Sequence, residues 1–368
     1  MDQHLTVLCG GQSSEHAISL ISAQNVANTL STAGCLVSVV FIDQKGRWFY
    51  LDGSFPINLS EAVKNVDALE PIVPSMHHAS HPWLSLSDPN RSYPCDCVLP
   101  ILHGPMGEDG TVQGLLTLMN LPYVGPDVLG SSLCMHKAAA REILLGHGIE
   151  SVPFYLVHAD QWEKEELLAV FCDWGEDVYV KPIRMGSAVG ISHASSETGF
   201  FAAMREAFRY DTQIMIEPAM KGRELEVAVR GSLGQLESTL PGEICRGDVF
   251  YSYSEKYAAS STSLVQVPAD LDPDTAQSVS EQAAEIAEIL RCEGMVRIDG
   301  YLLESGEYLF SEANTIPGFT SISMYPKMWE HAGDSQAELL KHLVGIAMQR
   351  FNARSALESA QPDVQVSV

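Results

Sequence analysis

Two strand-like runs within the stretch MVRIDGYLLESGEYLFSEANTIPGFTSIS constrain the fold of this chain more than any other feature. Residues 296–303 and 307–310 flank Ser305-Gly306, a pair typical of a tight turn. We therefore expect an antiparallel β-hairpin, in which residues of one run lie opposite residues of the other.

Three oxygen-bearing side chains, Asp299, Glu312 and Asn314, belong to this stretch. The hairpin brings Asp299 beside the other two, and the period of a strand puts Glu312 and Asn314 on one face while Ala313 points away. Two carboxylates and an amide suit Mg²⁺ shared with substrate phosphates far better than zinc or copper. Any one of these residues alone could instead lie on a solvent-exposed strand face without binding metal. The complete set, with Arg297 two residues before Asp299, favours a magnesium site.

The chain is strongly acidic, since 22 Lys and Arg against 47 Asp and Glu give a formal charge of −25. This charge argues against a general affinity for nucleic acid or anionic membranes. Anionic substrates would depend on the few basic residues near the predicted site, Lys137, Lys181, Lys256 and Arg297. At 368 residues the chain is long enough for two or three modules.

The eight cysteines are scattered without CxxC or zinc-type spacing, which is typical of reduced thiols in a cytoplasmic protein. The N-terminus enters a strand without a basic-then-apolar leader, and no apolar run approaches the roughly 18 residues of a membrane span. We expect a cytoplasmic protein without a membrane segment.

The first third alternates strands and helices. Residues 5–9, 36–42 and 97–102 are apolar strands, and 14–33 form a helix, which predicts an α/β module with a doubly wound parallel sheet. The polar turns GGQSSEH and HGPMGEDG follow two of these strands, where open α/β sheets usually bind ligands. Neither GxGxxG nor GxxxxGK[ST] occurs. An alternative role for the serines of GGQSSEH is to cap the following helix.

Residues 55–91 are weakly patterned and rich in proline and histidine, which favours a surface insertion. His77, His78 and His81 could bind metal, but loop histidines without an acidic or cysteine partner are more often solvated. We expect no metal site there.

A second module begins near residue 135. It contains a helix at 137–146 and a strand, glycine-rich turn and strand at 178–192 (VYVKPIRMGSAVGIS). The backbone amides of Gly186, Ser187, Ala188 and Val189 could cradle phosphates beside Lys181, with an ordinary β-hairpin as the alternative.

The remaining third begins with a strand, a turn at Lys221-Gly222 and an alternating strand that puts Glu224 and Glu226 on one face. Residues 244–262 are expected to form a long functional loop. The amphipathic patterns of 275–290 and 337–351 predict helices, and the polar tail ESAQPDVQVSV is expected to be disordered.

Seven motifs together resemble the D-alanine–D-alanine ligases of the ATP-grasp superfamily, in the family's order and over nearly the whole chain. They are GGQSSEHAISLISA, LHGPMGEDGTVQG, YVGPDVLGSS, VKPIRMGSAVGIS, EPAMKGRELEVAV, FYSYSEKY and SEANTIPGFTSISMYP. The resemblance implies an ATP-grasp fold with an N-terminal doubly wound parallel-sheet domain (1–134), a central subdomain with the glycine-rich lid (135–213), a C-terminal subdomain with the magnesium site and the loop 244–262 (214–355), and a tail (356–368).

The resemblance also implies roles for individual residues. For ATP, it gives Lys137, Lys181 and Lys256 to the phosphates, Glu217 and the backbone near Met220 to adenine, and Glu224 to the ribose. For magnesium, it gives two ions, replaceable by Mn²⁺, to Asp299, Glu312 and Asn314. For D-alanine, it gives Glu15, His103, Arg297 and Ser323 to substrate binding, Arg297 and the Gly318 amide to charge stabilisation, and Ser187, Tyr257 and Glu15 to a hydrogen-bonded latch of the lid.

The implied reaction is ATP-dependent ligation of two D-alanines through an acyl phosphate, which supplies peptidoglycan precursor. Partners would be ATP, D-alanine and a second subunit, since the family is usually dimeric. Two departures from the family pattern are Ala188, where a second serine is common, and His136, where an acidic residue is usual. The alternatives are a ligase that uses D-lactate or D-serine as second substrate, which Tyr257 disfavours, and an inactive nucleotide-binding regulator, which the complete ligand set disfavours.

Overall fold

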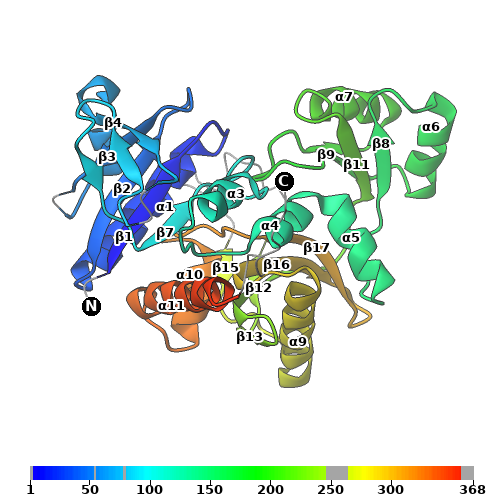
Figure 1. The fold of residues 1–368 in the computed structure, drawn as a ribbon. Helices are drawn as coiled ribbons and strands as arrows, with labels where there is room; N and C mark the ends of the chain where they lie inside the picture. Colours follow the sequence, from blue (N-terminus) through cyan, green and yellow to red (C-terminus); the bar gives the residue numbers. More distant parts are fainter. Residues whose placement is uncertain (1–2, 54, 78–79, 246–263, 358–368) are drawn as a thin grey trace, which may run out of the picture.

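The computed structural model describes residues 3–53, 55–77, 80–245 and 264–357, and three sheets organise them (Figure 1). The first sheet has seven strands in the order β6-β5-β4-β3-β2-β1-β7. Their bounds are β1 (His4–Gly10), β2 (Leu36–Ile42), β3 (Trp48–Leu51), β4 (Glu70–Pro74), β5 (Trp83–Ser85), β6 (Ser92–Tyr93) and β7 (Cys97–Ile101). Only β1, β2 and β7 are mutually parallel, so the predicted parallel module extends into an antiparallel edge.

Helices α1 (His16–Thr32) and α3 (Thr111–Leu118) accompany this sheet, together with the short α2 (Leu59–Ala62) and the 3₁₀ helix η1 (Val66–Ala68). Helix α1 buries one face, from Ile18 to Leu30, because its apolar residues recur at helical spacing. Helix α4 (Val128–Met135) leads on from this part of the chain to the central part.

The expectation of a surface insertion at 55–91 is wrong. This segment supplies β4 and β5, and Trp83 of β5 is fully buried in a hydrophobic cluster of this sheet. Short strands interrupted by proline give little local pattern, so only pairing with β3 reveals them. His78 lies outside the described residues.

The second sheet has four antiparallel strands in the order β10-β9-β11-β8. They are β8 (Tyr155–His158), β9 (Val178–Pro182), β10 (Ser192–Ala194) and β11 (Gln213–Pro218). Helices α6 (Lys164–Asp173) and α7 (Glu197–Ala207) cover one face, where Phe171 stacks on Phe200. Helix α5 (Lys137–Gly146) matches its predicted bounds.

The third sheet is antiparallel, in the order β15-β14-β12-β16-β17, with β13 beside β12. The strands are β12 (Arg223–Ser232), β13 (Gln235–Ser238), β14 (Gly242–Cys245), β15 (Leu264–Gln266), β16 (Gly294–Leu302) and β17 (Tyr308–Asn314), and the helices are α9 (Pro273–Ile289), α10 (Met324–His331) and α11 (Gln336–Ser355). In Figure 1 the first sheet stands at the left of the third sheet and the second sheet at its upper right.

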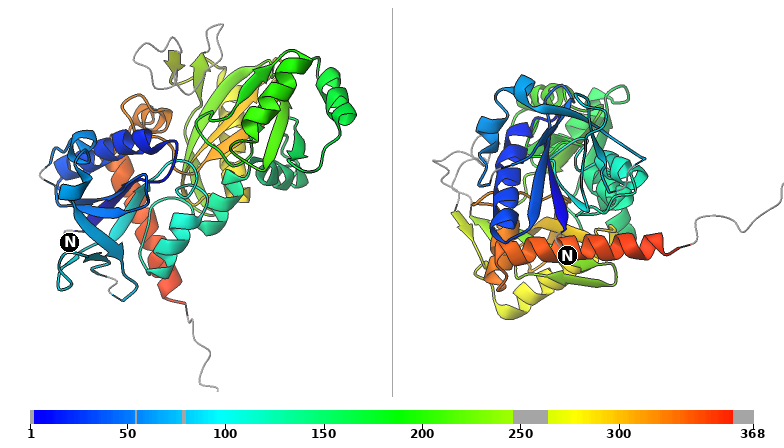
Figure 2. Two further views of the ribbon diagram at one scale, coloured as in Figure 1. Left: turned by 90° about the horizontal axis from the view of Figure 1, so that it is seen from above. Right: turned by 60° about the vertical axis from the view of Figure 1, so that its left-hand side comes forward.

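One hydrophobic core joins the ends of the chain. Apolar residues of β1, β2 and β7 share it with α10 and α11, and α11 runs along the base of the first sheet in Figure 2. The division at 134 and 213 stays a prediction. Among the described helices, none is both long enough and apolar enough to cross a bilayer.

Candidate active site

A cleft lies between the second and third sheets and encloses about 780 Å³ of empty space, partly open to solvent. Six residues predicted for ATP, metal or lid line it: Lys181, Ser187, Glu217, Met220, Glu224 and Glu312. The structure therefore brings together motifs that are far apart in the sequence.

The predicted hairpin is confirmed as the pair β16–β17. Asp299 lies opposite Glu312, Arg297 lies opposite Asn314, and a register shift follows Asp299. The Asn314 amide donates a hydrogen bond to Asp299 Oδ2 at 2.8 Å, so the predicted metal ligands are neighbours. Of the three, Glu312 lines the cleft, and neighbouring oxygen donors of this chemistry fit Mg²⁺.

Arg297 lies among carboxylates on the same sheet. Its Nε and Nη2 atoms bond both oxygens of Asp299 at 2.7 and 2.6 Å, and its Nε lies 3.0 Å from Glu226 Oε2. Burial alone would lower the pKa of Arg297, but the charges of Asp299 and Glu226 raise it well above its usual value. The guanidinium is therefore a fixed positive charge. Its predicted contact with substrate stays a prediction.

Two lysines approach the cleft from different elements. Lys137, the first residue of α5, donates from Nζ to the Met185 carbonyl at 2.7 Å and lies 3.3 Å from Glu312 Oε2. Lys181, on β9, pairs with Glu217 Oε2 at 2.6 Å. Burial lowers the pKa of Lys181 in spite of this partner. These side chains place positive charge in an otherwise acidic protein.

Glu217 has a second buried partner that the sequence did not reveal. Arg141 Nη1 lies 2.7 Å from Glu217 Oε1. Burial would raise the pKa of the Glu217 carboxyl, but Arg141 and Lys181 outweigh burial and hold it below its usual value. The carboxylate is therefore an acceptor at the end of β11.

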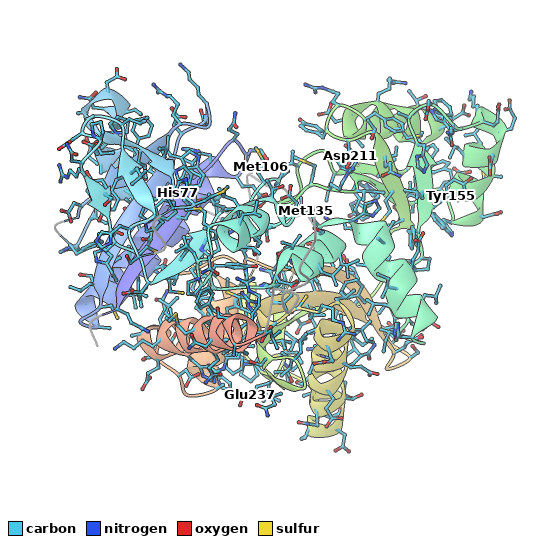
Figure 3. All side chains as sticks on the ribbon, in the orientation of Figure 1. His77, Met106, Met135, Tyr155, Asp211 and Glu237 are labelled. Carbon is cyan, nitrogen blue, oxygen red and sulfur yellow. The ribbon has the colours of Figure 1, made fainter. Side chains whose placement is uncertain are left out.

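The glycine-rich turn between β9 and β10 reaches the first sheet. Ser187 donates a hydrogen bond to Glu15 Oε1. Figure 3 labels Met106, in the turn after β7, and Asp211, just before β11, where these two parts of the molecule approach each other. Ser187 and Ala188 have φ angles of 49° and 58°, an uncommon conformation for non-glycine residues. The Val189 amide bonds to the Gly186 carbonyl at 3.1 Å, so it is engaged within the turn. The other three amides of the predicted phosphate cradle stay a prediction.

His103 connects the first sheet to the turn after β17. Its ring nitrogens lie 3.0 Å from the Ile316 carbonyl and 3.2 Å from Ser22 Oγ. Burial lowers its pKa to about 4, so the ring is neutral near pH 7. These contacts hold the turn in place, and direct substrate binding by His103 stays a prediction.

Glu108 is a further carboxylate that the sequence analysis missed, although it belongs to the quoted HGPMGEDG turn. It accepts hydrogen bonds from the amides of Gly104, at 2.7 Å, and Ile316, at 3.1 Å. Burial and the nearby charge of Glu15 raise its pKa. Glu108 thus ties the turn after β7 to the 315–320 turn.

The last predicted residues, Gly318 and Ser323, lie in the 315–320 turn and at the start of α10. Ser323 Oγ accepts a hydrogen bond from the Thr320 amide at 2.9 Å, and a side chain on Gly318 would lie 2.8 Å from that Oγ. A glycine at position 318 therefore leaves room for the Ser323 hydroxyl. Lys256 and Tyr257 lie outside the described residues.

Family models cover most of the chain. The model described as D-ala D-ala ligase N-terminus matches residues 4–126, and the model described as D-ala D-ala ligase C-terminus matches residues 143–345.

Curated relatives and solved structures agree with these models. A D-alanine--D-alanine ligase of Coxiella burnetii is 39% identical over 357 residues, covering 96% of each chain, and one of Proteus mirabilis is 35% identical, covering 96% of this chain and 98% of its own. The structure of the Coxiella burnetii D-alanine-D-alanine ligase superposes with a TM-score of 0.86 at 38% identity, covering 96% of each chain. The VanG D-Ala:D-Ser ligase of Enterococcus faecalis gives 0.82 at 32% identity, covering 94% of this chain and all of that one.

Proposed function

The chain belongs to the D-alanine–D-alanine ligase family, whose members have the ATP-grasp fold, and we propose that it joins two D-alanines at the expense of ATP. One observation carries the proposal: the cleft brings two buried lysines and an oxygen-ligand set together, beneath a turn that bonds to Glu15. The product would supply peptidoglycan precursor in the cytoplasm.

ATP would lie in the cleft between the second and third sheets. Lys137, Lys181 and Lys256 bind its phosphates, Glu217 and the Met220 backbone bind adenine, and Glu224 binds the ribose. The burial of Lys137 and Lys181 supports these roles, because a phosphate partner offsets the desolvation of an ammonium group.

The family uses ATP and Mg²⁺ in general. In this chain two ions, replaceable by Mn²⁺, would be held by Asp299, Glu312 and Asn314. When bound, the metal neutralises charge on the phosphates. The oxygen chemistry of these neighbouring side chains supports the assignment.

The reaction needs activation, because a carboxylate does not react with an amine. Glu15 holds the ammonium of the first D-alanine, whose carboxylate attacks the γ-phosphate to give an acyl phosphate and ADP. Ser323 holds the carboxylate of the second D-alanine, and His103 helps to shape the substrate site. The second amine then attacks the acyl carbon and phosphate leaves, while Arg297 and the Gly318 amide stabilise the developing oxyanion.

Water must be kept from the acyl phosphate. Ser187, Tyr257 and Glu15 would latch the lid, and the bond from Ser187 to Glu15 supports one half of this link. The Lys137 side chain bonds to Met185 and approaches Glu312, so His136 does not prevent Lys137 from reaching the cleft.

The second substrate is the finer question, because a D-Ala:D-Ser ligase superposes nearly as well as a D-alanine-D-alanine ligase. We propose D-alanine on the basis of Tyr257. D-Lactate, D-serine and an inactive regulator remain the alternatives. Phosphate release with ATP and Mg²⁺ should depend on D-alanine and be absent with L-alanine, and mass spectrometry should find D-alanyl-D-alanine. A mixed product as the major species would favour a D-serine or D-lactate enzyme, and no phosphate release would favour the regulator.

We also propose a homodimer. Leu118 on α3 and Leu129 on α4 are 69% and 55% exposed, and these helices are in contact. A dimer interface over these helices would cover both side chains. Sedimentation at micromolar concentration should give twice the mass of the 40.1 kDa chain.

A further inference from the structure

Arg141 is a buried cation beside the nucleotide cleft. It lies one helical turn after Lys137 on α5, and its side chain has no exposed area. A buried guanidinium requires partners for its N–H groups, because an unpaired charge away from water is strongly destabilising.

Those partners come from three separate segments. Nε and Nη2 donate to the Ser311 carbonyl at 3.1 and 2.7 Å, and Nη1 donates to the Val152 carbonyl at 3.0 Å. Nη1 also lies 2.7 Å from Glu217 Oε1. Ser311 belongs to the third sheet and Glu217 to the second, so Arg141 fixes Glu217 against the opposite wall of the cleft.

The two oxygens of Glu217 have different partners. Arg141 holds Oε1 on the interior side, whereas Lys181 holds Oε2 at 2.6 Å. Glu217 and Lys181 line the cleft, and Arg141 is not among the residues that line it. If Lys181 turns to phosphate when ATP binds, Arg141 is the partner that stays with the carboxylate.

We infer that Arg141 is a positioning residue that keeps Glu217 ionised and oriented toward the base, and so sets the preference for adenine over guanine; this inference rests on the proposed nucleotide site. Adenine presents an exocyclic amino group, which donates to a carboxylate, whereas guanine presents a carbonyl oxygen at the same ring position. A carboxylate fixed in this orientation accepts a hydrogen bond from the adenine amino group and repels the guanine carbonyl oxygen.

The test compares the affinities of ATP and GTP, measured by calorimetry with Mg²⁺, in wild type, Arg141→Met and Arg141→Lys. Arg209→Met is the matched control, because Arg209 pairs with Glu206 on the exposed surface of the second sheet's helices. We expect Arg141→Met to lower the affinity for ATP at least tenfold and the affinity for GTP less than threefold. Arg141→Lys should have an intermediate effect, and the control should have the affinities of wild type. The KM for D-alanine should stay within twofold.

A second comparison, between Glu217→Gln and the double variant Glu217→Gln/Arg141→Met, tests the inference if Arg141→Met alone does not fold. Both proteins lack the buried carboxylate, so they should have the same ratio of ATP to GTP affinity. An unchanged ratio in Arg141→Met, or a further fall in the double variant relative to Glu217→Gln, overturns the inference. Binding needs no turnover, so wild-type protein that prefers ATP but forms no dipeptide would refute the proposed function alone.

Discussion

Ser187 donates a hydrogen bond to the carboxylate of Glu15, which joins the glycine-rich turn to the loop after the first strand. The two residues are 172 positions apart, so this bond exists only when the second sheet approaches the first. The bond therefore fixes the turn against the loop that carries Glu15, and we propose that this contact closes the lid.

Ser187→Ala should weaken this closure. A hydrogen bond to a charged group contributes about 1.5 to 3 kcal/mol, so we expect kcat/KM for D-alanine to fall roughly 10- to 150-fold. The ratio of phosphate to dipeptide should rise above one as water reaches the acyl phosphate, and Tyr257→Phe should act in the same direction. Ser196→Ala is the control, since Ser196 only caps α7. A one-to-one ratio with wild-type turnover would mean that the bond does not hold the lid.

Gly186→Ala should disturb the contact between the turn and Glu15. A Cβ at position 186 would lie 2.8 Å from Glu15 Oε2, so the end of the Glu15 side chain must shift to make room. We expect the KM for D-alanine to rise, because Glu15 is proposed to hold the substrate ammonium, while the thermal unfolding temperature changes little. Gly146→Ala adds the same methyl group at a position with nothing within 4 Å and should leave the KM unchanged. Equal effects of the two changes would contradict the proposed role of the contact between the turn and Glu15.

Glu312→Gln should abolish turnover without unfolding the protein. The change keeps the side-chain shape but removes a proposed metal-binding charge from the lining of the cleft. Phosphate release across a Mg²⁺ titration is the measurement, and Glu307→Gln on the exposed end of the same hairpin is the control. Near-normal release from Glu312→Gln at any Mg²⁺ concentration would refute the metal assignment.

Sequence alone predicted the parts of the fold that local chemistry determines. Residues 296–310 form a hairpin because a serine-glycine turn separates two apolar runs, and α5 begins and ends as predicted. The strand β5 was missed because the burial of Trp83 depends on pairing with β4 and packing on Trp48 rather than on a local pattern.

In the candidate site, too, residues in local motifs could be predicted, whereas a residue that depends on long-range contacts could not. Lys181 stands in a recognisable motif and the family resemblance implies Lys137, whereas Arg141 follows three alanines in a helix, where an arginine is usually solvated. Its burial is set by Ser311, 170 residues away. No spacing rule in the sequence reports that contact, so Arg141 could be found only from the structure.

The buried ring of His103 should make stability depend on pH between about 6.5 and 4. Burial lowers its folded pKa to about 4 from the usual 6.5, so the unfolded chain binds more protons in this window and the free energy of unfolding falls as pH falls. The contribution of His103 to the free energy of unfolding is at most about 3 kcal/mol, and roughly 2 kcal/mol of it should be lost between pH 7 and pH 5.

The raised pKa of Glu108 makes stability change with pH in the opposite direction, because there the folded state binds the extra proton. The measurement is therefore the difference between wild type and His103→Gln in urea unfolding at the two pH values, in which the contribution of Glu108 largely cancels. His103→Gln should lose less stability than wild type on acidification, and exposed His331→Gln should behave like wild type. Parallel losses in wild type and His103→Gln would show that the ring is not held neutral by its burial.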